Sequence, residues 1–297
     1  MVAISITDML PSAVEAFRNK DVRKAERLCR AILAAAPGQL QAMEMLAEVL
    51  AFTNRSAEAI PLFQQIVFTL DGALAAMSLG HGLTLLRKLG WHPSAILDVG
   101  AYRGQWSQMA HQIYPQAFVL MIEAQPKLQP VLQTLAAAHP EKFGFRRALL
   151  GPERRDAVDF FQMDVPITTG SSLYEEQTRF ARSVIKLSML RLDDVVAEYG
   201  GRRFQMLKLD VQGAELDILK GATATLRDIE VLVVELSVVE YNKGAPLFAD
   251  MIAALKDLGF LMFDVYPLAR SQTGALLQVD GIFLRRDSSL WAKPPYF

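Results

Sequence analysis

The chain has 297 residues, of which 52% are apolar and 21% charged, and its net charge is −1. This composition supports a sizeable buried core and excludes a disordered protein. The near-zero charge gives no general attraction for nucleic acid or an anionic membrane, and no apolar run reaches the roughly 18 residues that a membrane span needs. Cys29 is the only cysteine, so we expect no disulfide framework and a reducing compartment. Residues 1–10 lack a basic start and a long apolar core, so we expect no signal peptide and a cytoplasmic protein.

Residues 8–90 are predicted to be helical, because Ala, Leu, Glu, Gln, Lys and Arg dominate and no period-2 pattern is present. Residues 24–32 align with residues 58–66 at an offset of 34, a spacing that resembles the tetratricopeptide repeat of two antiparallel helices. Two such repeats rarely stand alone, so residues 73–89 are a candidate cap that joins them to the rest. The alternative is a generic helical bundle. We expect a helical domain over residues 1–90 that binds a protein partner or an extended acceptor, or forms a homodimer.

From Trp91 onward, short apolar strands alternate with helices. This pattern predicts an α/β domain over residues 91–297, with a mostly parallel sheet covered by helices on both faces and a ligand at the carboxyl ends of the strands. The last two strands are expected to form a hairpin at the sheet edge. The expected strands are 94–99, 117–122, 143–149, 157–163, 204–209, 230–236, 260–265 and 277–284, and the expected helices are 104–114, 126–138, 192–199 (capped by Asp193), 214–226 and 247–258.

A glycine turn follows the first of these strands. It contains Asp98, Gly100 and Gly104. Glycines there let a ligand approach the backbone, and the helix that follows offers free N–H groups. Asp98 would repel the pyrophosphate of a dinucleotide, whereas a cationic, phosphate-free ligand such as S-adenosylmethionine tolerates it. The turn also lacks the G-x-G-x-x-G spacing, which makes an NAD-dependent oxidoreductase the weaker alternative.

Further acids follow the other strands. Glu123 ends the second strand about 20 residues after the turn, where a carboxylate can bind both hydroxyls of an adenosine ribose. Lys208, Asp210 and Glu215 lie around the end of a later buried strand, and Glu235 ends the next one. Because the carboxyl ends of parallel strands share one edge, we expect these groups to converge. The alternatives are structural: Lys208 reaches out to solvent, and Glu215 is a helix-start charge.

In this order, the motifs resemble the FkbM family of S-adenosylmethionine-dependent methyltransferases over about residues 94–285. The block 208–215 is the most specific part. Residues 170–173, with Ser171 and Ser172, and the pair at 193–194 also fit the family's pattern. The resemblance implies a class I methyltransferase (Rossmann-like) fold and methyl transfer from S-adenosylmethionine, usually to a hydroxyl oxygen.

The resemblance also implies a cofactor site. Glu123 would hold the ribose hydroxyls, and Ala148 and Leu149 would lie by the adenine. The family often has an acid shortly after the third strand, near the adenine amino group. Here Leu150 is followed by Gly-Pro-Glu-Arg-Arg, so that contact is missing or supplied by the backbone. The implied cofactor residues are Asp98, Gly100, Ala101, Gly104, Glu123, Ala124, Ala148 and Leu149.

The methyl group of a sulfonium is already activated, so the enzyme must mainly align the acceptor oxygen, and an alcohol needs a base. Asp210 is the first candidate for base or substrate anchor, followed by Glu215 and Glu235. Lys208 would set the protonation or orientation of Asp210. No histidine joins these acids at a ligand spacing, so we expect no metal.

The acceptor is expected to be a small molecule or glycan with a hydroxyl group, such as a sugar or secondary metabolite. A predicted substrate loop over residues 164–190 includes Ser171 and Ser172. Basic residues scattered between positions 146 and 186 are typical of a solvated face, with an anionic acceptor as the alternative. A non-catalytic alternative is a repeat scaffold whose cofactor fold is idle.

Overall fold

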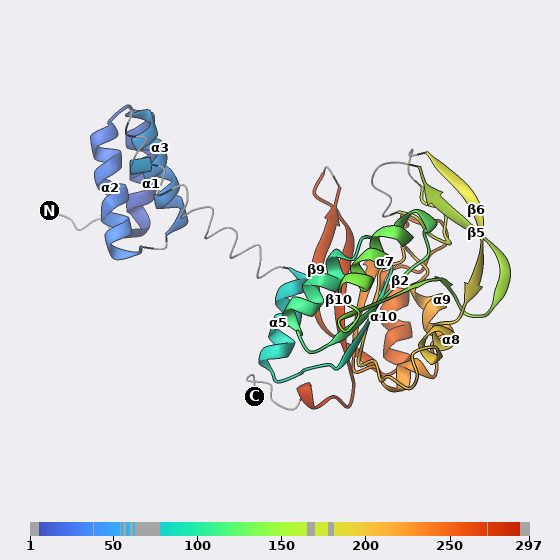
Figure 1. Ribbon diagram of the computed structural model, residues 1–297. Coiled ribbons are helices and arrows are strands. Elements are labelled where there is room, and N and C mark those ends of the chain that lie inside the picture. Colours follow the sequence, from blue (N-terminus) through green and yellow to red (C-terminus); the bar gives the residue numbers. More distant parts are fainter. Residues whose placement is uncertain are drawn as a thin grey trace. The chain divides into compact units, whose positions relative to one another are not determined.

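The computed structural model describes residues 6–37, 39–53, 55, 58–59, 62, 78–164, 170–177, 181–271 and 273–291. The contacts between residues divide the chain into two compact units, Met1–Ala76 and Met77–Phe297. Figure 1 shows their helices and strands and labels many of them.

The described residues of the first unit are mostly helical, as the composition predicted, and include α1 (Ile6–Arg18), α2 (Val22–Ala35) and α3 (Leu40–Phe52). Buried residues of α2, including Leu28 and Cys29, recur at helical spacing and pack with residues of α1 and α3. Most of residues 58–66, the second helix of the expected second repeat, lies outside the described residues. The tetratricopeptide architecture therefore stays a prediction.

Helix α5 (Leu79–Lys88) belongs to the second unit. Leu83 and Leu86 are fully buried in a cluster with residues of the sheet, and the Tyr114 hydroxyl donates to the carbonyl of Leu83 at 2.6 Å. The sequence placed a boundary after residue 90. The contacts place it before α5 instead, because the apolar face of this helix is buried in the second unit.

The second unit is built on a seven-stranded sheet with the order β3-β2-β1-β7-β8-β10-β9. Its first five strands pair in parallel, and β10 runs antiparallel to both neighbours. The mostly parallel sheet and the terminal hairpin are confirmed, with β9 at the edge. The order reverses between β1 and β7, which is where such sheets bind ligands. The strands are β1 (Ala95–Val99), β2 (Phe118–Glu123), β3 (Phe143–Arg147), β7 (Met206–Leu209), β8 (Val231–Ser237), β9 (Phe260–Arg270) and β10 (Leu276–Arg285).

Helices cover both faces of this sheet, as predicted (Figure 1). Alternate residues of β1 enter different cores: Leu97 packs with residues of α8, α9 and α10, whereas Ile96 packs with residues of α5, α6 and α7. Within the described residues, no helix is both long and apolar enough to cross a bilayer. The helices are α6 (Gln105–Ile113), α7 (Gln129–Ala138), α8 (Leu192–Ala197), α9 (Glu215–Lys220) and α10 (Phe248–Asp257), with 3-10 turns η1 (Pro126–Leu128), η2 (Thr225–Arg227) and η3 (Ser289–Trp291).

A second, three-stranded sheet has the order β4-β6-β5. Its strands are β4 (Leu149–Leu150), β5 (Arg155–Met163) and β6 (Arg182–Leu190). The strand expected over 143–149 is thus divided, because its end pairs with β6 and not with β2. Strand β6 was not predicted from the sequence, and it lies inside the predicted substrate loop over residues 164–190. Figure 1 shows β5 and β6 as an antiparallel ribbon projecting from the main sheet.

Two helix ends differ from the prediction. The helix expected over 214–226 ends at Lys220, and η2 follows it. Asp193 does not cap α8, whose N-cap residue is Arg191. The Asp193 carboxylate instead accepts hydrogen bonds from the backbone N–H groups of Thr225, at 2.8 Å, and Ala224, at 3.0 Å, so it anchors η2 to α8.

Candidate active site

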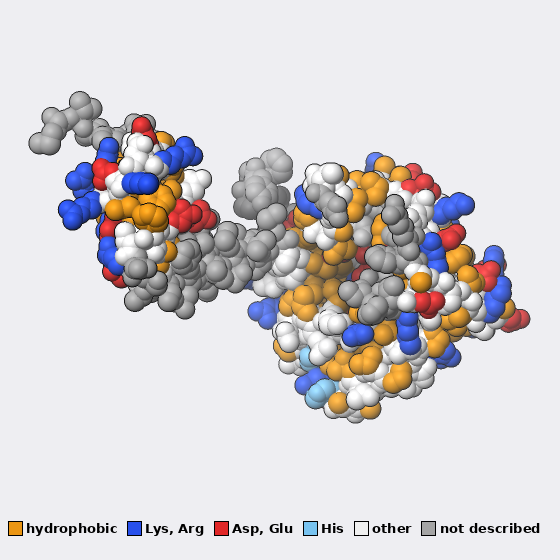
Figure 2. All heavy atoms as spheres, turned by 90° about the horizontal axis from the view of Figure 1, so that it is seen from above, with side chains coloured by type: hydrophobic (Ala, Val, Ile, Leu, Met, Phe, Trp, Pro, Cys, Tyr) orange, Lys and Arg blue, Asp and Glu red, His pale blue; other side chains and the backbone are white. Residues whose placement is uncertain are grey.

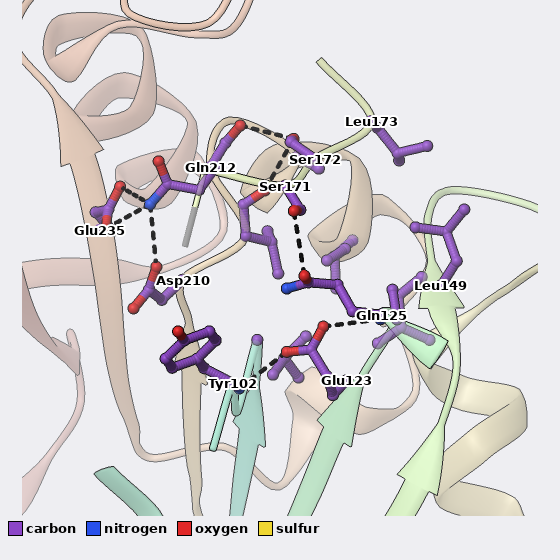
Figure 3. A pocket seen from close by; sticks show the side chains of 18 of the residues that line it. Tyr102, Glu123, Gln125, Leu149, Ser171, Ser172, Leu173, Asp210, Gln212 and Glu235 are labelled. Atoms are coloured by element: carbon purple, nitrogen blue, oxygen red, sulfur yellow. Dashed lines mark hydrogen bonds between the residues drawn. The ribbon is translucent and has the colours of Figure 1, made fainter. Parts of the chain in front are cut away.

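A cavity of about 330 Å³ lies at the carboxyl ends of β1, β2, β7 and β8, beside the reversal of strand order. Its volume falls within the range of small-molecule sites, and Figure 3 shows its lining. The lining consists of Val99, Gly100, Tyr102, Ile122, Glu123, Ala124, Gln125, Ala148, Leu149, Leu150, Phe160, Gly170, Ser171, Ser172, Leu173, Asp210, Val211, Gln212, Ala214, Ile218, Glu235, Tyr241, Leu268 and Gln278.

The two glycines of the turn are required by the protein's own packing. Gly100 has φ +77°, and a Cβ there would collide with the carbonyl oxygen of Asp210. Gly104 has φ +81° as the N-cap of α6, and a Cβ there would lie 2.8 Å from Cδ2 of Leu135. Gly100 lines the cavity, whereas Ala101 and Gly104 do not. The protein's own packing therefore requires both glycines, and the predicted role of Gly100, Ala101 and Gly104 in binding the cofactor stays a prediction.

Asp98 lies behind the cavity wall, not in the wall itself. Its side chain is fully buried, accepts a 2.6 Å hydrogen bond from the Ser107 hydroxyl and lies 3.2 Å from the Lys208 ammonium. Asp210, and not Asp98, is therefore the acid that faces the cavity, and the predicted effect of Asp98 on the choice of ligand stays a prediction.

Lys208 joins β1 to β7 from behind the cavity. Its Nζ lies 3.2 Å from Oδ1 of Asp98 and 3.3 Å from Oδ2 of Asp210, and it donates to the carbonyl of Gly100 at 3.0 Å. Burial alone would lower the pKa of Lys208, but the Asp210 and Asp98 carboxylates outweigh burial and raise it. Lys208 is therefore a buried cation that holds Asp210 beside the glycine turn.

Glu123 lines the cavity at the end of β2. Its Oε2 accepts a hydrogen bond from the backbone N–H of Tyr102, and its Oε1 accepts one from the N–H of Gln125, both at 2.9 Å. Burial outweighs these bonds and raises the pKa of Glu123. A carboxylate offers about four lone-pair sites, so its two oxygens retain acceptor capacity for a ligand.

Asp210 and Glu235 line the other side of the cavity from Glu123 (Figure 3). The side-chain amide of Gln212 lies between them, and its Nε2 donates to Oε1 of Glu235 at 2.8 Å and to Oδ1 of Asp210 at 3.3 Å. A second amide, that of Gln278, donates to Glu235 at 2.6 Å.

These two acids have opposite protonation preferences. Burial favours the neutral form of Asp210, but the charge of Lys208 outweighs it and lowers the pKa of Asp210. Burial, with the nearby charges of Asp210 and Glu215, raises the pKa of Glu235 well above its usual range. The pKa values of the two acids are therefore shifted in opposite directions, which favours a proton on Glu235 over one on Asp210.

Glu215 is buried but does not line the cavity. Its Oε1 accepts hydrogen bonds from the N–H groups of Val211, at 3.0 Å, and Gly213, at 3.2 Å. Burial raises the pKa of Glu215 to about 7. Its contacts hold the loop after β7, so the structure places Glu215 as a positioning residue one layer behind Asp210.

Ser171 and Ser172 lie in a short segment over the cavity. The Ser171 hydroxyl accepts from the N–H of Met163 at 3.0 Å and donates to Oε1 of Gln125 at 3.2 Å. The Ser172 hydroxyl donates to the carbonyls of Gln212, at 2.8 Å, and Val211, at 3.0 Å. The segment therefore connects the loop after β2 with the loop after β7. Of the rest of the predicted substrate loop, residues 165–169 and 178–180 lie outside the described residues.

The cavity wall beside β4 is apolar. Ala124, Ala148 and Leu149 line it, as the resemblance implies, together with Leu150 and Phe160. The acid often found after the third strand has no counterpart in the described lining here. This wall can accept a flat, uncharged ring.

Sequence analysis missed several lining residues. Gln212 lies inside the motif 208–215, but an amide between two acids was not weighed. Gln278 and Tyr241 reach the cavity from parts of the chain that only the strand order brings close. Tyr102 and Gln212 have backbone φ angles of +51° and +58°. Residues other than glycine rarely adopt this backbone conformation, and it often marks a functional site. A tyrosine or glutamine in the sequence does not predict this conformation.

The described residues of the predicted basic scatter are exposed or half-buried at the surface. Arg146 pairs with Glu198, Arg154 with Asp194, and Lys186 with Asp159. On the face of the second unit seen in Figure 2, charged side chains of both signs are interspersed. No lysine, arginine or histidine is among the cavity residues that the structure describes.

Comparison with known proteins decides the family. Residues 98–262 match the sequence model of the Methyltransferase FkbM domain, more than half of the chain. The chain belongs to this family. It is therefore a methyltransferase and not an NAD-dependent oxidoreductase.

In the described residues, no group of three or more acids, histidines or cysteines forms a metal site.

Two relatives of this FkbM-domain protein are fungal methyltransferases. Methyltransferase sdnD of Sordaria araneosa is 29% identical over 196 residues, which cover 56% of this chain and 73% of the relative. Methyltransferase 1 of Beauveria bassiana is 29% identical over 184 residues, which cover 56% and 72%. Among solved structures, the O-methyltransferase TomG of Streptomyces achromogenes, in complex with S-adenosylmethionine, is 16% identical with a TM-score of 0.40, covering 69% of this chain and 78% of TomG.

Proposed function

We propose that this FkbM-domain protein transfers a methyl group from S-adenosylmethionine to a hydroxyl oxygen of a sugar, glycan or secondary metabolite. The observation that carries the proposal is one cavity with Glu123 on one side and the Asp210–Glu235 pair on the other. The first side suits a nucleoside, and the second suits a reacting hydroxyl.

The methyl donor is S-adenosylmethionine, as the family resemblance implies, and the cavity residues fit it. Ala148, Leu149 and Phe160 provide an apolar wall for the adenine. Glu123 retains acceptor capacity for the ribose hydroxyls. The turn at Gly100 and the loop at Asp210 form the floor for the methionine part.

The donor supplies an activated methyl group when bound. The acceptor oxygen forms a bond to the methyl carbon as the bond from that carbon to sulfur breaks, and sulfur keeps the electron pair. The acceptor must lose its hydroxyl proton. Asp210 is the base in this proposal, because Lys208 keeps it ionised and because it faces the cavity. The amides of Gln212 and Gln278 orient the neighbouring Glu235.

The cavity also bears on the chemical class of the acceptor. Tyr241 and Gln278 provide polar groups without a full charge, and Leu268 adds an apolar surface. With two acids and no described basic side chain on this wall, an uncharged hydroxyl compound fits better than an anionic one. The proposed acceptor is therefore a neutral sugar or metabolite.

The proposal is tested by incubating the full chain with methyl-labelled S-adenosylmethionine and a panel of neutral sugars, glycans and polyketide alcohols. Asp210→Asn should lower methyl transfer at saturating donor by about 10²-fold or more, with affinity for S-adenosylhomocysteine retained. Asp257→Asn, on the exposed end of α10, is the matched control and should keep the wild-type rate. An Asp210→Asn enzyme that works at the wild-type rate would remove Asp210 as the base. A chain that binds no donor would remove the proposal.

Three further proposals follow from the sequence. The helices of the first unit bind a protein partner or an extended acceptor, or form a homodimer. Their repeat architecture is that of the tetratricopeptide repeat. The protein acts in the cytoplasm. Light scattering of the purified chain tests the homodimer.

A further inference from the structure

The side of the cavity next to β7 and β8 holds more acidic than basic charge. Lys208 is shared by Asp98 and Asp210, at 3.2 and 3.3 Å. Two carboxylates against one ammonium leave one negative charge in excess. Glu235 lies beside Asp210 and brings a further carboxyl group. Among the described residues that line the cavity, no cation balances this excess.

The carboxyl groups around Asp210 respond to this excess. Burial and the charge of Asp210 together raise the pKa of Glu215 to about 7 and that of Glu235 well above its usual range. The same two causes raise the pKa of Asp280, the register partner of Glu235 on β10, to about 7. On three different elements, burial is therefore the largest cause of a raised carboxyl pKa, and the negative charge of Asp210 adds to it.

Neutral amides hold the two cavity acids in place. Gln212 donates to both oxygens of Glu235, at 2.8 and 3.0 Å, and to Asp210 at 3.3 Å. The backbone carbonyl of Gln212 accepts from the Ser172 hydroxyl at 2.8 Å. An amide supplies hydrogen bonds but no net positive charge. The amides thus fix the two carboxyl groups in position without offsetting the excess negative charge beside Lys208.

A buried charge without a partner is costly, and a ligand group of opposite charge relieves that cost. The donor carries such a group, because its sulfur bears a positive charge one carbon away from the ribose ring. The spent donor, S-adenosylhomocysteine, lacks the methyl group and that charge but is otherwise the same molecule. With the ribose at Glu123, as proposed, the sulfur would lie in the cavity that Asp210 also lines.

We propose that Asp210 and Glu235, bridged by the amide of Gln212, form a charge-selective site for the sulfonium of the donor, which binds the charged donor more tightly than the uncharged product. This inference rests on the proposed function. When the sulfonium arrives, its positive charge favours ionisation of Glu235, whose proton is released. Loss of the charge on methyl transfer weakens the contact and favours exchange of product for fresh donor.

Calorimetric titration of the full chain with S-adenosylmethionine and with S-adenosylhomocysteine tests the proposal. The donor should bind at least about tenfold more tightly, a difference of about 1.4 kcal/mol. Titrations in two buffers of different ionisation enthalpy should show proton release with the donor and none with the product. Donor affinity should therefore rise with pH, and product affinity should not.

Variants separate this role from general binding. Asp210→Asn and Glu235→Gln should bring the affinity ratio close to one by weakening the donor alone. Glu123→Gln is the matched control, because Glu123 would contact the ribose that both ligands share. It should weaken both and leave the ratio unchanged. Sinefungin carries an ammonium group in place of the methylsulfonium, and in the wild-type protein it should share the preference for the charged ligand.

The outcomes distinguish the two proposals. If the wild-type chain binds donor, product and sinefungin equally, the charge-selective site is wrong while the methyltransferase proposal stands. If none of the three binds, the proposed cofactor site is wrong as well. A preference for the donor that persists in Glu235→Gln and Asp210→Asn would also overturn the inference.

Discussion

At the scale of single residues, the motif that is most specific in the sequence acts mainly on the protein itself. Lys208 and Glu215 lie behind the cavity and hold the loop that carries Asp210. Residue 100 must be glycine because the Asp210 carbonyl lies where a Cβ would be. The sequence predicts that these residues gather at one edge of the sheet, because they follow parallel strands. Their spacing does not reveal which of them faces a ligand. Only Asp210 and Glu235 of the four predicted catalytic residues line the cavity.

Replacing Gly100 with alanine should destabilise the fold by more than about 3 kcal/mol. The new Cβ would both adopt φ +77° and collide with the Asp210 carbonyl. Gly244→Ala is a matched control with the same φ of +77° and nothing within 4 Å of its Cβ. It should cost only about 1 kcal/mol of backbone strain. Urea unfolding measures the loss of unfolding free energy in each variant. Equal losses in Gly100→Ala and Gly244→Ala would show that residue 100 does not lie against the Asp210 carbonyl.

The buried carboxyl of Glu215 predicts a pH dependence of stability. Its pKa rises on folding from 4.5 to about 7 because of burial. The folded state therefore binds more protons between these values, and the free energy of unfolding falls as pH rises through this window. Glu215→Gln keeps an acceptor for the two backbone N–H groups and removes the charge. Above neutral pH, this variant should be more stable than the wild type by on the order of 2 kcal/mol.

Urea unfolding at several pH values checks this expectation. The variant should lose less stability than the wild type as pH rises. Some slope should remain, because Glu235 and Asp280 also have raised pKa values. A variant with the same slope as the wild type would contradict the burial of a titrating carboxyl at this position.

At the scale of elements, the loops after the strands form the site, and the segment with Ser171 and Ser172 connects two of them. The Ser172 hydroxyl holds the loop after β7 by two backbone carbonyls. Ser172→Ala should therefore weaken binding of S-adenosylhomocysteine about three- to tenfold, in line with a lost hydrogen bond of about 1 kcal/mol. Ser188→Ala is the control. Ser188 is an exposed residue of β6 whose hydroxyl donates a hydrogen bond to the Asp156 carbonyl on β5, and its loss should leave the affinity for S-adenosylhomocysteine unchanged. Calorimetry compares the two, and equal affinities would exclude a role for the segment.

The sequence predicts the parallel strands of the main sheet well. It does not predict strand β6 of the small sheet or the position of β10 between β8 and β9. Strands β1, β2, β7 and β8 are apolar runs buried on both faces, so their composition alone marks them. By contrast, β6 has mostly exposed or half-buried residues, and no apolar run distinguishes it. Gln278 reaches Glu235 because β10 inserts beside β8. This pairing depends on contacts between distant segments and cannot be derived from local pattern.

At the scale of the whole molecule, the division into units gives a direct test by truncation. A chain of residues 77–297 retains α5 and should fold with wild-type affinity for S-adenosylhomocysteine. A chain of residues 91–297 loses Leu83 and Leu86, which are fully buried. Removing them exposes the core beneath and should cost more than about 4 kcal/mol of unfolding free energy. Equal stability of the two truncations in urea would place the boundary after α5, as the sequence suggested.

We propose that the cavity at the ends of β1, β2, β7 and β8 binds the methyl donor. A crystal structure of the full chain with S-adenosylhomocysteine tests it most directly. We predict that the ribose hydroxyls bind the Glu123 carboxylate, that the adenine lies against Ala148 and Leu149, and that the sulfur points toward Asp210. A ligand bound elsewhere, or one in this cavity whose ribose does not contact Glu123, would contradict the account.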